Sequence, residues 1–468
     1  MLASVHSGSQ IPKFTNIFLF ISDTARAAVA DNDGIQKLIS LLRDAKNLSA
    51  EGADRLRMVA CGLLMNLTNT HETVEEKALS LGAMDVLKQY LELHANDEGV
   101  AHMALLSIGS LADTDVGKTQ LLESSILETI ANFMGRDDNE NIQETLLELL
   151  TNLAENDQVK LELARSSIDE RLLNLLQRSE QKSDDERLQT EKSVSDLIVL
   201  LLTGDEAMEV LYGDGKGPIY LESLSWLESS NEQLYVSGTL AVGNFARNDT
   251  RCLKLVESGI TETLLTLLER HSNVDDASPT LQHAVFSALR NLAIPVANKP
   301  RMLDCDVIDR ILLPHMHTEF SSVQFKLLGT LRMIIDGQES AARCLGTKEE
   351  FVEKLVSWCT VEGHAGVKGE ANRLVASLIK HSHNSDVVLT VIKYGGVQHL
   401  VSMATSEHAV MQNEALVALT LTAVYVLGHL LELMRLAELP GIIAEMQTHN
   451  EEMVSEQAKD VIASLNSG

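Results

Sequence analysis

Residues 282–292 read QHAVFSALRNL, an apolar run that holds small residues and ends next to an asparagine. Its apolar side chains recur at spacings of three and four, which is typical of an amphipathic helix. An asparagine or a serine stands near the end of a similar run at five places: Asn66, Ser110, Asn152, Asn244 and Asn291. The steps between them are 44, 42, 92 and 47 residues, and 92 is twice 46. A helical period in the low-to-middle forties predicts an armadillo or HEAT solenoid.

In each repeat the sequence predicts a turn that contains a small residue, then an apolar helix, a polar stretch and a second, more buried helix. Only 7 prolines occur, and none lies between Lys13 and Gly217, which also favours helices. We predict an all-α, right-handed superhelical armadillo solenoid of about ten repeats at residues 34–468, after an atypical N-terminal segment at residues 1–33. The hydrophilic stretches at residues 179–192 and 272–278 are predicted to be loops.

The charge balance narrows the choice of partner. The chain has 38 basic and 67 acidic residues, a net charge of −29. Nucleic acid is a poor partner for such a surface, because phosphate binding needs clustered lysine and arginine. A basic polypeptide is the natural complement, although the charge alone is also explained by solubility.

Motifs for chemistry or membrane insertion are weak. The five cysteines are scattered and odd in number, which indicates reduced thiols inside a cell. No run of 18 apolar residues predicts a membrane span. The glycine-rich residues 213–217 lack the serine or threonine of a nucleotide loop, and the paired histidines do not form a four-ligand zinc set. We therefore expect no metal, no cofactor and no enzyme.

The recurring asparagines have a physical use, because a carboxamide both donates and accepts hydrogen bonds. A ladder of them along the inner helices could hold the backbone of an extended peptide. Asn244 and Asn248 are four residues apart, as are Asn152 and Asn156, so we expect each pair to share one helix face. The alternative is that asparagines such as Asn291 bind the backbone between repeats.

Acidic residues cluster just after these asparagines. Among them are Glu155, Asp157 and Asp249, which we assign to a predicted acidic patch. Acids near a helix C-terminus oppose the helix dipole, so their repetition indicates a surface that favours negative potential. Asp157 and Asp249 have a second interpretation as N-caps of the next helix.

Five longer strings go beyond a generic repeat: NFARND (244–249), ALRNLAIPV (288–296), VQFKLLGTLRM (323–333), MATSEH (403–408) and MQNEALVAL (411–419). In these strings the chain resembles the small-GTPase GDP-dissociation stimulator family. The likeness runs from about Gly34 onward. The first 33 residues depart from it, and from Leu433 onward the chain resembles the family's final repeat, as if one repeat had been skipped.

The resemblance implies an armadillo protein that binds small GTPases, such as Rho members, with polybasic prenylated C-terminal tails. It implies that the protein stimulates GDP dissociation by binding, without covalent catalysis, and escorts these GTPases around prenylation. The family's groove asparagines fall on Asn244 and Asn248, and its acidic patch falls on the stretch with Glu148 and Glu155. We expect a cytosolic monomer that reaches the endoplasmic reticulum or other membranes through prenylated clients.

Two other binding functions compete with this one. A nuclear-import adaptor of the importin-α kind also binds basic peptides, but it pairs tryptophan with asparagine on the inner helix, and here Trp226 and Trp358 lie on other helices. A catenin-like scaffold has a basic groove that takes acidic ligands.

Overall fold

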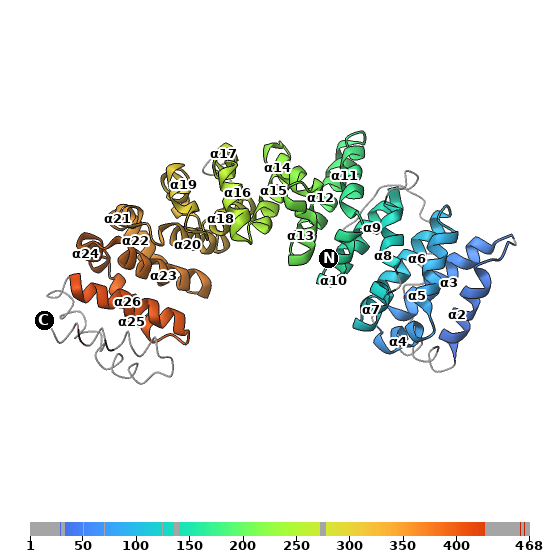
Figure 1. Cartoon of the computed structure of the whole chain (residues 1–468). Coiled ribbons are helices and arrows are strands. Elements are labelled where there is room, and N and C mark those ends of the chain that lie inside the picture. Colours follow the sequence, from blue (N-terminus) through green and yellow to red (C-terminus); the bar gives the residue numbers. More distant parts are fainter. Residues whose placement is uncertain are drawn as a thin grey trace. The chain divides into compact units, whose positions relative to one another are not determined.

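A computed structural model describes residues 33–49, 51–69, 71–123, 125–134, 140–271 and 278–425, with the single residues 29, 459 and 463. The chain divides into two compact units, Met1–Glu222 and Ser223–Gly468. All regular elements in the described ranges are helical, and no strand occurs among them (Figure 1). The predicted final repeat from Leu433 lies outside the described residues.

Unit 1 holds the following helices: α2 (Gly34–Ala45), α3 (Ala53–Thr68), α4 (Glu72–Ser80), α5 (Ala83–Leu93), α6 (Glu98–Leu111), α7 (Asp115–Glu123), α8 (Ile126–Phe133), α9 (Glu140–Leu153), α10 (Asp157–Arg165), α11 (Ile168–Ser179), α12 (Asp184–Leu201), α13 (Asp205–Tyr212) and the short η2 (Gly213–Gly215). The boundary between the units falls within α14 (Pro218–Ser225).

Unit 2 continues with these helices: η3 (Trp226–Glu228), α15 (Glu232–Phe245), α16 (Asp249–Glu257), α17 (Ile260–His271), α18 (Pro279–Leu292), α19 (Asn298–Asp304), η4 (Ile308–Leu312), η5 (Pro314–His317), α20 (Ser321–Ile335), α21 (Glu339–Gly346), α22 (Glu349–Trp358), α23 (Ala365–Ser382), α24 (Ser385–Lys393), α25 (Gly396–Ala404) and α26 (Ala409–Tyr425).

The repeat consists of three helices rather than the two read from the sequence. A short first helix, such as α4 or α16, precedes a second helix and a longer third helix. Consecutive third helices pack against one another: α3, α6, α9 and α12 in unit 1, and α15, α18, α20, α23 and α26 in unit 2. This stacking buries a continuous core of leucine, isoleucine, valine and alanine along each unit. The predicted all-α armadillo fold is confirmed.

The small-residue turns of the sequence join the first helix of a repeat to the second. Gly82 precedes α5 with φ 77°, and Gly259 precedes α17 with φ 90°. Glycine suits these positions because it adopts positive φ without a steric penalty. Ser125 and Ser167 occupy the equivalent turns before α8 and α11 with φ 53° and 56°. These turns therefore mark the same point, between the first and second helices, in each of these repeats.

One predicted loop is a helix. Most of residues 179–192 belongs to α12, which begins at Asp184 and runs for 18 residues. Its charged residues suggested a loop, but glutamate, arginine, glutamine and lysine are strong helix formers. The second predicted loop, at residues 272–278, lies outside the described residues except for Ser278.

No single described helix is long and apolar enough to cross a membrane. The pair α24 and α25 passes the same test of length and composition only when taken together, across a 90° bend.

Candidate functional site

The ladder asparagine Asn291, on α18, serves the contact between repeats. Its Nδ2 donates to the backbone carbonyl of Gly243 on α15 at 2.9 Å. The equivalent Asn66 of unit 1 is buried and donates to Gly62 within its own helix, also at 2.9 Å. The alternative interpretation, a hydrogen bond to the backbone of a neighbouring repeat, is therefore confirmed for Asn291 but not for Asn66, whose bond stays within its own helix.

Asn244 and Asn248 do not share one helix face. Asn244 lies in the last turn of α15 and its Oδ1 accepts from Arg247. α15 ends at Phe245, and Asn248 is the N-cap of α16, where its Oδ1 accepts from the backbone N–H groups of Thr250 at 2.9 Å and Arg251 at 3.4 Å. The i, i+4 interpretation of this pair is wrong, because a turn separates the two residues.

The pair Asn152 and Asn156 shows the same arrangement in unit 1. Asn152 is exposed near the end of α9. Asn156 is the N-cap of α10 and accepts from the N–H groups of Gln158 at 2.9 Å and Val159 at 3.2 Å. Its Oδ1 satisfies two backbone donors that a helix start leaves unpaired. The shared face predicted for this pair is therefore also wrong.

Asp157 and Asp249 occupy the first positions of α10 and α16, one residue after the capping asparagines. They are not the caps, and they do not stand at a helix C-terminus. Negative charge in the first turn is favourable, because the helix dipole is positive there. Asp157 also accepts from Lys160 at 2.7 Å. The repeated dipole penalty inferred from the sequence does not exist at these two positions.

Glu148 lies on α9, Glu155 lies in the turn that follows this helix, and both are exposed. Glu144 and Asn152 are exposed on α9 at spacings of four residues from Glu148, so these three share one helix face, and Glu155 follows three residues after Asn152. We call Glu144, Glu148, Asn152 and Glu155 the α9 stripe. None of its side chains makes a hydrogen bond or an ion pair within the described part of the chain. The stripe therefore presents three carboxylates and one amide to solvent.

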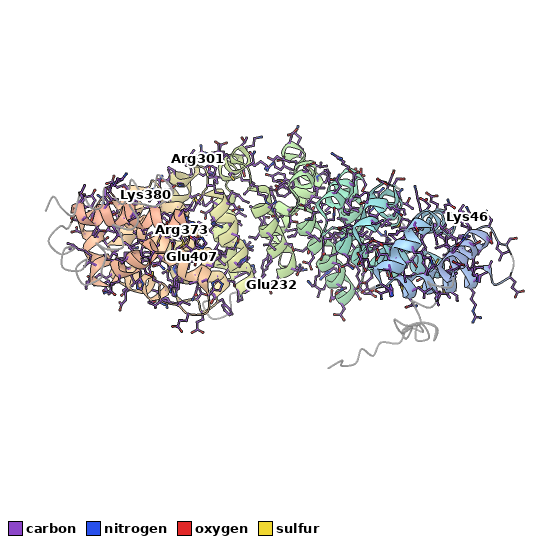
Figure 2. The ribbon with its side chains drawn as sticks, turned by 90° about the horizontal axis from the view of Figure 1, so that it is seen from below. Lys46, Glu232, Arg301, Arg373, Lys380 and Glu407 are labelled. Atoms are coloured by element: carbon purple, nitrogen blue, oxygen red, sulfur yellow. The ribbon has the colours of Figure 1, made fainter. Side chains whose placement is uncertain are left out.

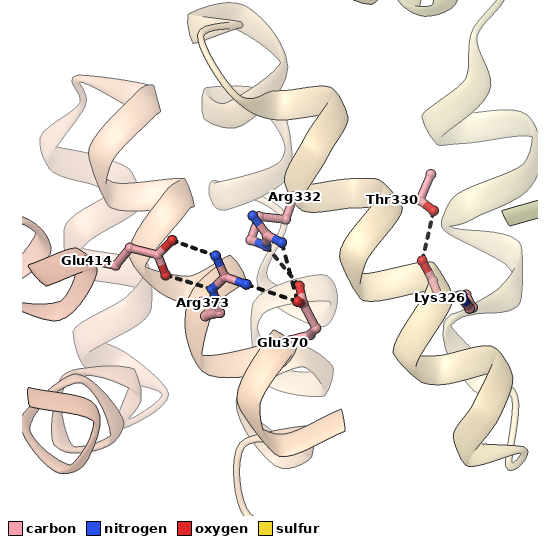
Figure 3. Close-up of polar contacts among 6 residues, drawn as sticks. All are labelled: Lys326, Thr330, Arg332, Glu370, Arg373 and Glu414. Atoms are coloured by element: carbon pink, nitrogen blue, oxygen red, sulfur yellow. Dashed lines mark hydrogen bonds and ion pairs between the residues drawn. The ribbon is translucent and has the colours of Figure 1, made fainter. Parts of the chain in front are cut away.

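The third helices of unit 2 carry an ion-pair network instead (Figure 3). Arg332 Nε on α20 donates to Glu370 Oε2 on α23 at 2.8 Å, and Arg373 Nη1 donates to Glu370 Oε1 at 3.1 Å. Arg373 makes two further 2.8 Å bonds to the carboxylate of Glu414 on α26. The network links three successive repeats with equal numbers of positive and negative charges.

Sequence reasoning missed this network, although a signal was present. Arg290, Arg332 and Arg373 recur at steps of 42 and 41 residues, which is the repeat period. The last of these arginines, Arg373, is labelled in Figure 2 and lies on α23. Exposed carboxylates without a partner among the described residues thus lie on α9 and in the turn after it in unit 1, whereas the third helices α20, α23 and α26 of unit 2 pair charges of both signs.

Other sequence expectations concern the tryptophans, the glycine loop and the histidines. Trp226 and Trp358 are buried at 3% exposure, in η3 and at the end of α22, neither of which is a third helix, although Trp226 packs against Gly238 of α15. Residues 213–215 form a short turn after α13. No group of three or more potential metal ligands occurs in the part of the chain that the structure describes.

Comparison with known proteins yields a family model and curated relatives. The Armadillo/beta-catenin-like repeat model matches residues 384–421, which run from the N-cap of α24 into α26. The chain is 42% identical over 398 residues to Rap1 GTPase-GDP dissociation stimulator 1-A of Xenopus laevis, covering 85% of this chain and 65% of the relative. It is 32% identical over 493 residues to the GTPase-GDP dissociation stimulator vimar of Drosophila melanogaster, covering 97% of this chain and 75% of the relative.

Solved structures share the fold. An engineered protein matches with a TM-score of 0.71 at 20% identity, covering 93% of this chain and 99% of that one. A structure from a study of the cadherin and beta-catenin interaction matches with a TM-score of 0.62 at 13% identity, covering 95% of this chain and 85% of that one. At these identities the matches establish the fold alone. The chain spans 65% of the length of the Xenopus relative.

Proposed function

Because the chain belongs to the family of armadillo-repeat GTPase-GDP dissociation stimulators, we propose that it binds small GTPases and accelerates the release of their GDP. The reaction needs no covalent step. A protein that binds the nucleotide-free form of a GTPase more tightly than the GDP-bound form shifts the equilibrium toward release.

The α9 stripe carries the first part of this proposal. Its three exposed carboxylates have no cationic partner among the described residues, and the chain as a whole has a net charge of −29. A polybasic C-terminal tail is the complementary ligand, since opposite charges accelerate the encounter and fix its orientation. Asn152 would supply an amide for the backbone of the tail, and Asp157 adds charge at the start of α10.

Asn244 and Asn248 carry the second part. In both residues Oδ1 is occupied, by Arg247 and by the N-terminus of α16. Neither Nδ2 group donates a hydrogen bond within the described residues. We propose that these amide donors bind backbone carbonyls of the GTPase, with Asp249 beside them. Asn291 contributes by holding α18 against α15.

We propose Rho-type GTPases with prenylated tails as preferred clients, a role as their escort around prenylation, and action in the cytosol with access to membranes through the clients. The unpartnered carboxylates of the α9 stripe are the single observation that supports the choice of a basic tail.

A panel assay tests the proposed activity. Rho-, Rap- and Ras-type GTPases are loaded with a fluorescent GDP analogue, and its release is followed with and without the full chain. We expect faster release from members with basic tails. No acceleration for any member would refute the proposed activity.

The import-adaptor alternative makes a different prediction. Such an adaptor needs tryptophan side chains beside the asparagines of the third helices, whereas Trp226 and Trp358 are buried in other helices. In a pull-down with immobilised full chain, we expect a prenylated Rho-type tail to bind more tightly than a basic nuclear-import peptide. The reverse order would favour the adaptor.

A further inference from the structure

Two cations on neighbouring third helices of unit 2 have no anionic partner. Arg290 on α18 makes no hydrogen bond or ion pair among the described residues, and its Nε is buried without an acceptor. Its side chain lies against Gly329 of α20, where a Cβ would stand 3.3 Å from the Nε. Lys326, also on α20, forms no ion pair there either, and its Nζ lies 5.9 Å from the centroid of the Phe325 ring.

The nearby carboxylates are already matched. Glu370 Oε2 lies 3.7 Å from the same Cβ position at Gly329, but Glu370 accepts from both Arg332 and Arg373. Glu414 is bound in turn by Arg373. The four-residue network is neutral by itself, so Arg290 and Lys326 leave this face with two uncompensated positive charges.

The lowered pKa values of two side chains on this face agree with an excess of positive charge. Burial and then the charge of Arg290 lower the pKa of Lys326, and no carboxylate acts in the opposite direction. Burial and then the charge of Lys326 lower the pKa of His283 on α18. Like charges held together in a partly buried place destabilise one another, so an anionic ligand would be bound favourably.

We propose that Arg290 and Lys326 form a binding surface for an acidic polypeptide segment, separate from the α9 stripe. A free phosphate fits less well. Many phosphate sites add backbone N–H groups at a helix start to their basic side chains, whereas Arg290 and Lys326 lie beyond the first turns of α18 and α20. Both residues offer side-chain donors alone, on consecutive repeats, which suits carboxylates spaced along an extended chain.

An acidic peptide is a demanding probe for a chain with a net charge of −29, because the general electrostatic effect is repulsive. A labelled peptide of alternating glutamate and serine is titrated with the full chain at low ionic strength, and its fluorescence anisotropy is measured. We expect binding by the unsubstituted chain. Arg290→Gln and Lys326→Gln should each weaken it about five-fold, which corresponds to about 1 kcal/mol.

The matched control is Arg343→Gln, which removes the same charge from an exposed position on the first helix α21. We expect it to leave the affinity for the acidic peptide unchanged. Circular dichroism of all three variants checks that each one is folded. The inference fails if the unsubstituted chain does not bind the peptide, if Arg343→Gln weakens binding as much as Arg290→Gln, or if inorganic phosphate at millimolar concentration displaces the peptide.

A basic-tail peptide is titrated with the same variants to keep this result apart from the proposed function. Its affinity should not fall in Arg290→Gln or Lys326→Gln. If the unsubstituted chain binds the acidic peptide but not the basic tail, the surface on α18 and α20 stands and tail capture by the α9 stripe is refuted.

Discussion

Asn291 donates from Nδ2 to the backbone carbonyl of Gly243 at 2.9 Å and thereby joins α18 to α15. The bond connects two third helices of unit 2, one repeat apart. An asparagine in the recurring position thus stabilises the stack, while Asn152 at the corresponding position of α9 is exposed to solvent. The same sequence position serves packing in one repeat and is available for binding in another.

Replacing Asn291 by alanine should lower the free energy of unfolding by about 1 to 2 kcal/mol, because the carbonyl of Gly243 loses its side-chain donor. Urea unfolding followed by circular dichroism measures the change. Asn152→Ala is the matched control, and we expect a change within about 0.5 kcal/mol for this exposed side chain. Equal losses in the two variants would contradict the packing role of Asn291.

Asn248 has two separable roles, since its Oδ1 caps α16 and its Nδ2 is proposed to bind the GTPase. Asn248→Ala should cost about 1 kcal/mol of stability through loss of the cap, and should also weaken GTPase capture. Asn248→Asp keeps a capping oxygen but removes the amide donor. We expect it to retain stability and still to bind a Rho-type GTPase more weakly, as measured by calorimetry. Full affinity in Asn248→Asp would exclude the amide as a contact.

The regular parts of the fold are predictable from the sequence because they repeat. The asparagine period and the turns at Gly82 and Gly259 locate the second and third helices. The pairing of Asn244 with Asn248 was mispredicted because a spacing of four is ambiguous: it fits one helix face, and it also fits a helix end followed by a cap. The turn between Phe245 and Asn248 is spanned by Arg251 of α16, whose Nε donates to the backbone carbonyl of Phe245 at 2.9 Å, and this contact is not readable from a spacing.

The charged contacts are harder to predict. Arg290, Arg332 and Arg373 recur in the sequence at the repeat period. The sequence does not tell which of these arginines forms an ion pair with a carboxylate. That depends on where Glu370 and Glu414 fall on neighbouring helices. The α9 stripe was predicted in part: Glu148 and Glu155 lie in the stretch that the family resemblance indicated, and Glu155 is one of the acids that follow the recurring asparagines.

Neutralising Glu148 and Glu155 together should weaken binding of a polybasic tail peptide by about three- to ten-fold at low salt, since exposed charges contribute a few tenths to 1 kcal/mol each. The measurement is a titration of labelled peptide with Glu148→Gln/Glu155→Gln at two salt concentrations. The difference from the unsubstituted chain should shrink as salt rises. Glu128→Gln, exposed on the second helix α8, is the control and should bind normally.

Asp336 and Lys299 form an ion pair at 2.6 Å, in which Lys299 is 1% exposed. Burial raises the pKa of Asp336, but the hydrogen bond and charge of Lys299, with the charges of His381 and Lys380, hold it below its ordinary value. A lowered pKa contributes stability above the ordinary aspartate range, and this contribution is lost as pH falls through the lower, folded-state value. Asp336→Asn should therefore destabilise the protein at neutral pH, by about 2 kcal/mol.

Urea midpoints at pH 7 and pH 3 measure this effect. The difference between Asp336→Asn and the unsubstituted chain should be large at pH 7 and smaller at pH 3, because the stabilising contribution is lost as the pH falls toward the lowered pKa of Asp336. Asp309→Asn is the control, because Asp309 pairs with Lys348 at 2.7 Å on the exposed surface. A pH-independent difference for Asp336→Asn would contradict the assigned ion pair.

The rate of GDP release from one Rho-type GTPase, with its basic tail intact or removed, tests the central claim most directly. The full chain should accelerate release from the intact GTPase, and removing the tail or introducing Glu148→Gln/Glu155→Gln should each reduce the acceleration at low salt. Combining the two changes should reduce it no further than removing the tail alone. Equal acceleration with and without the tail would contradict capture by the α9 stripe.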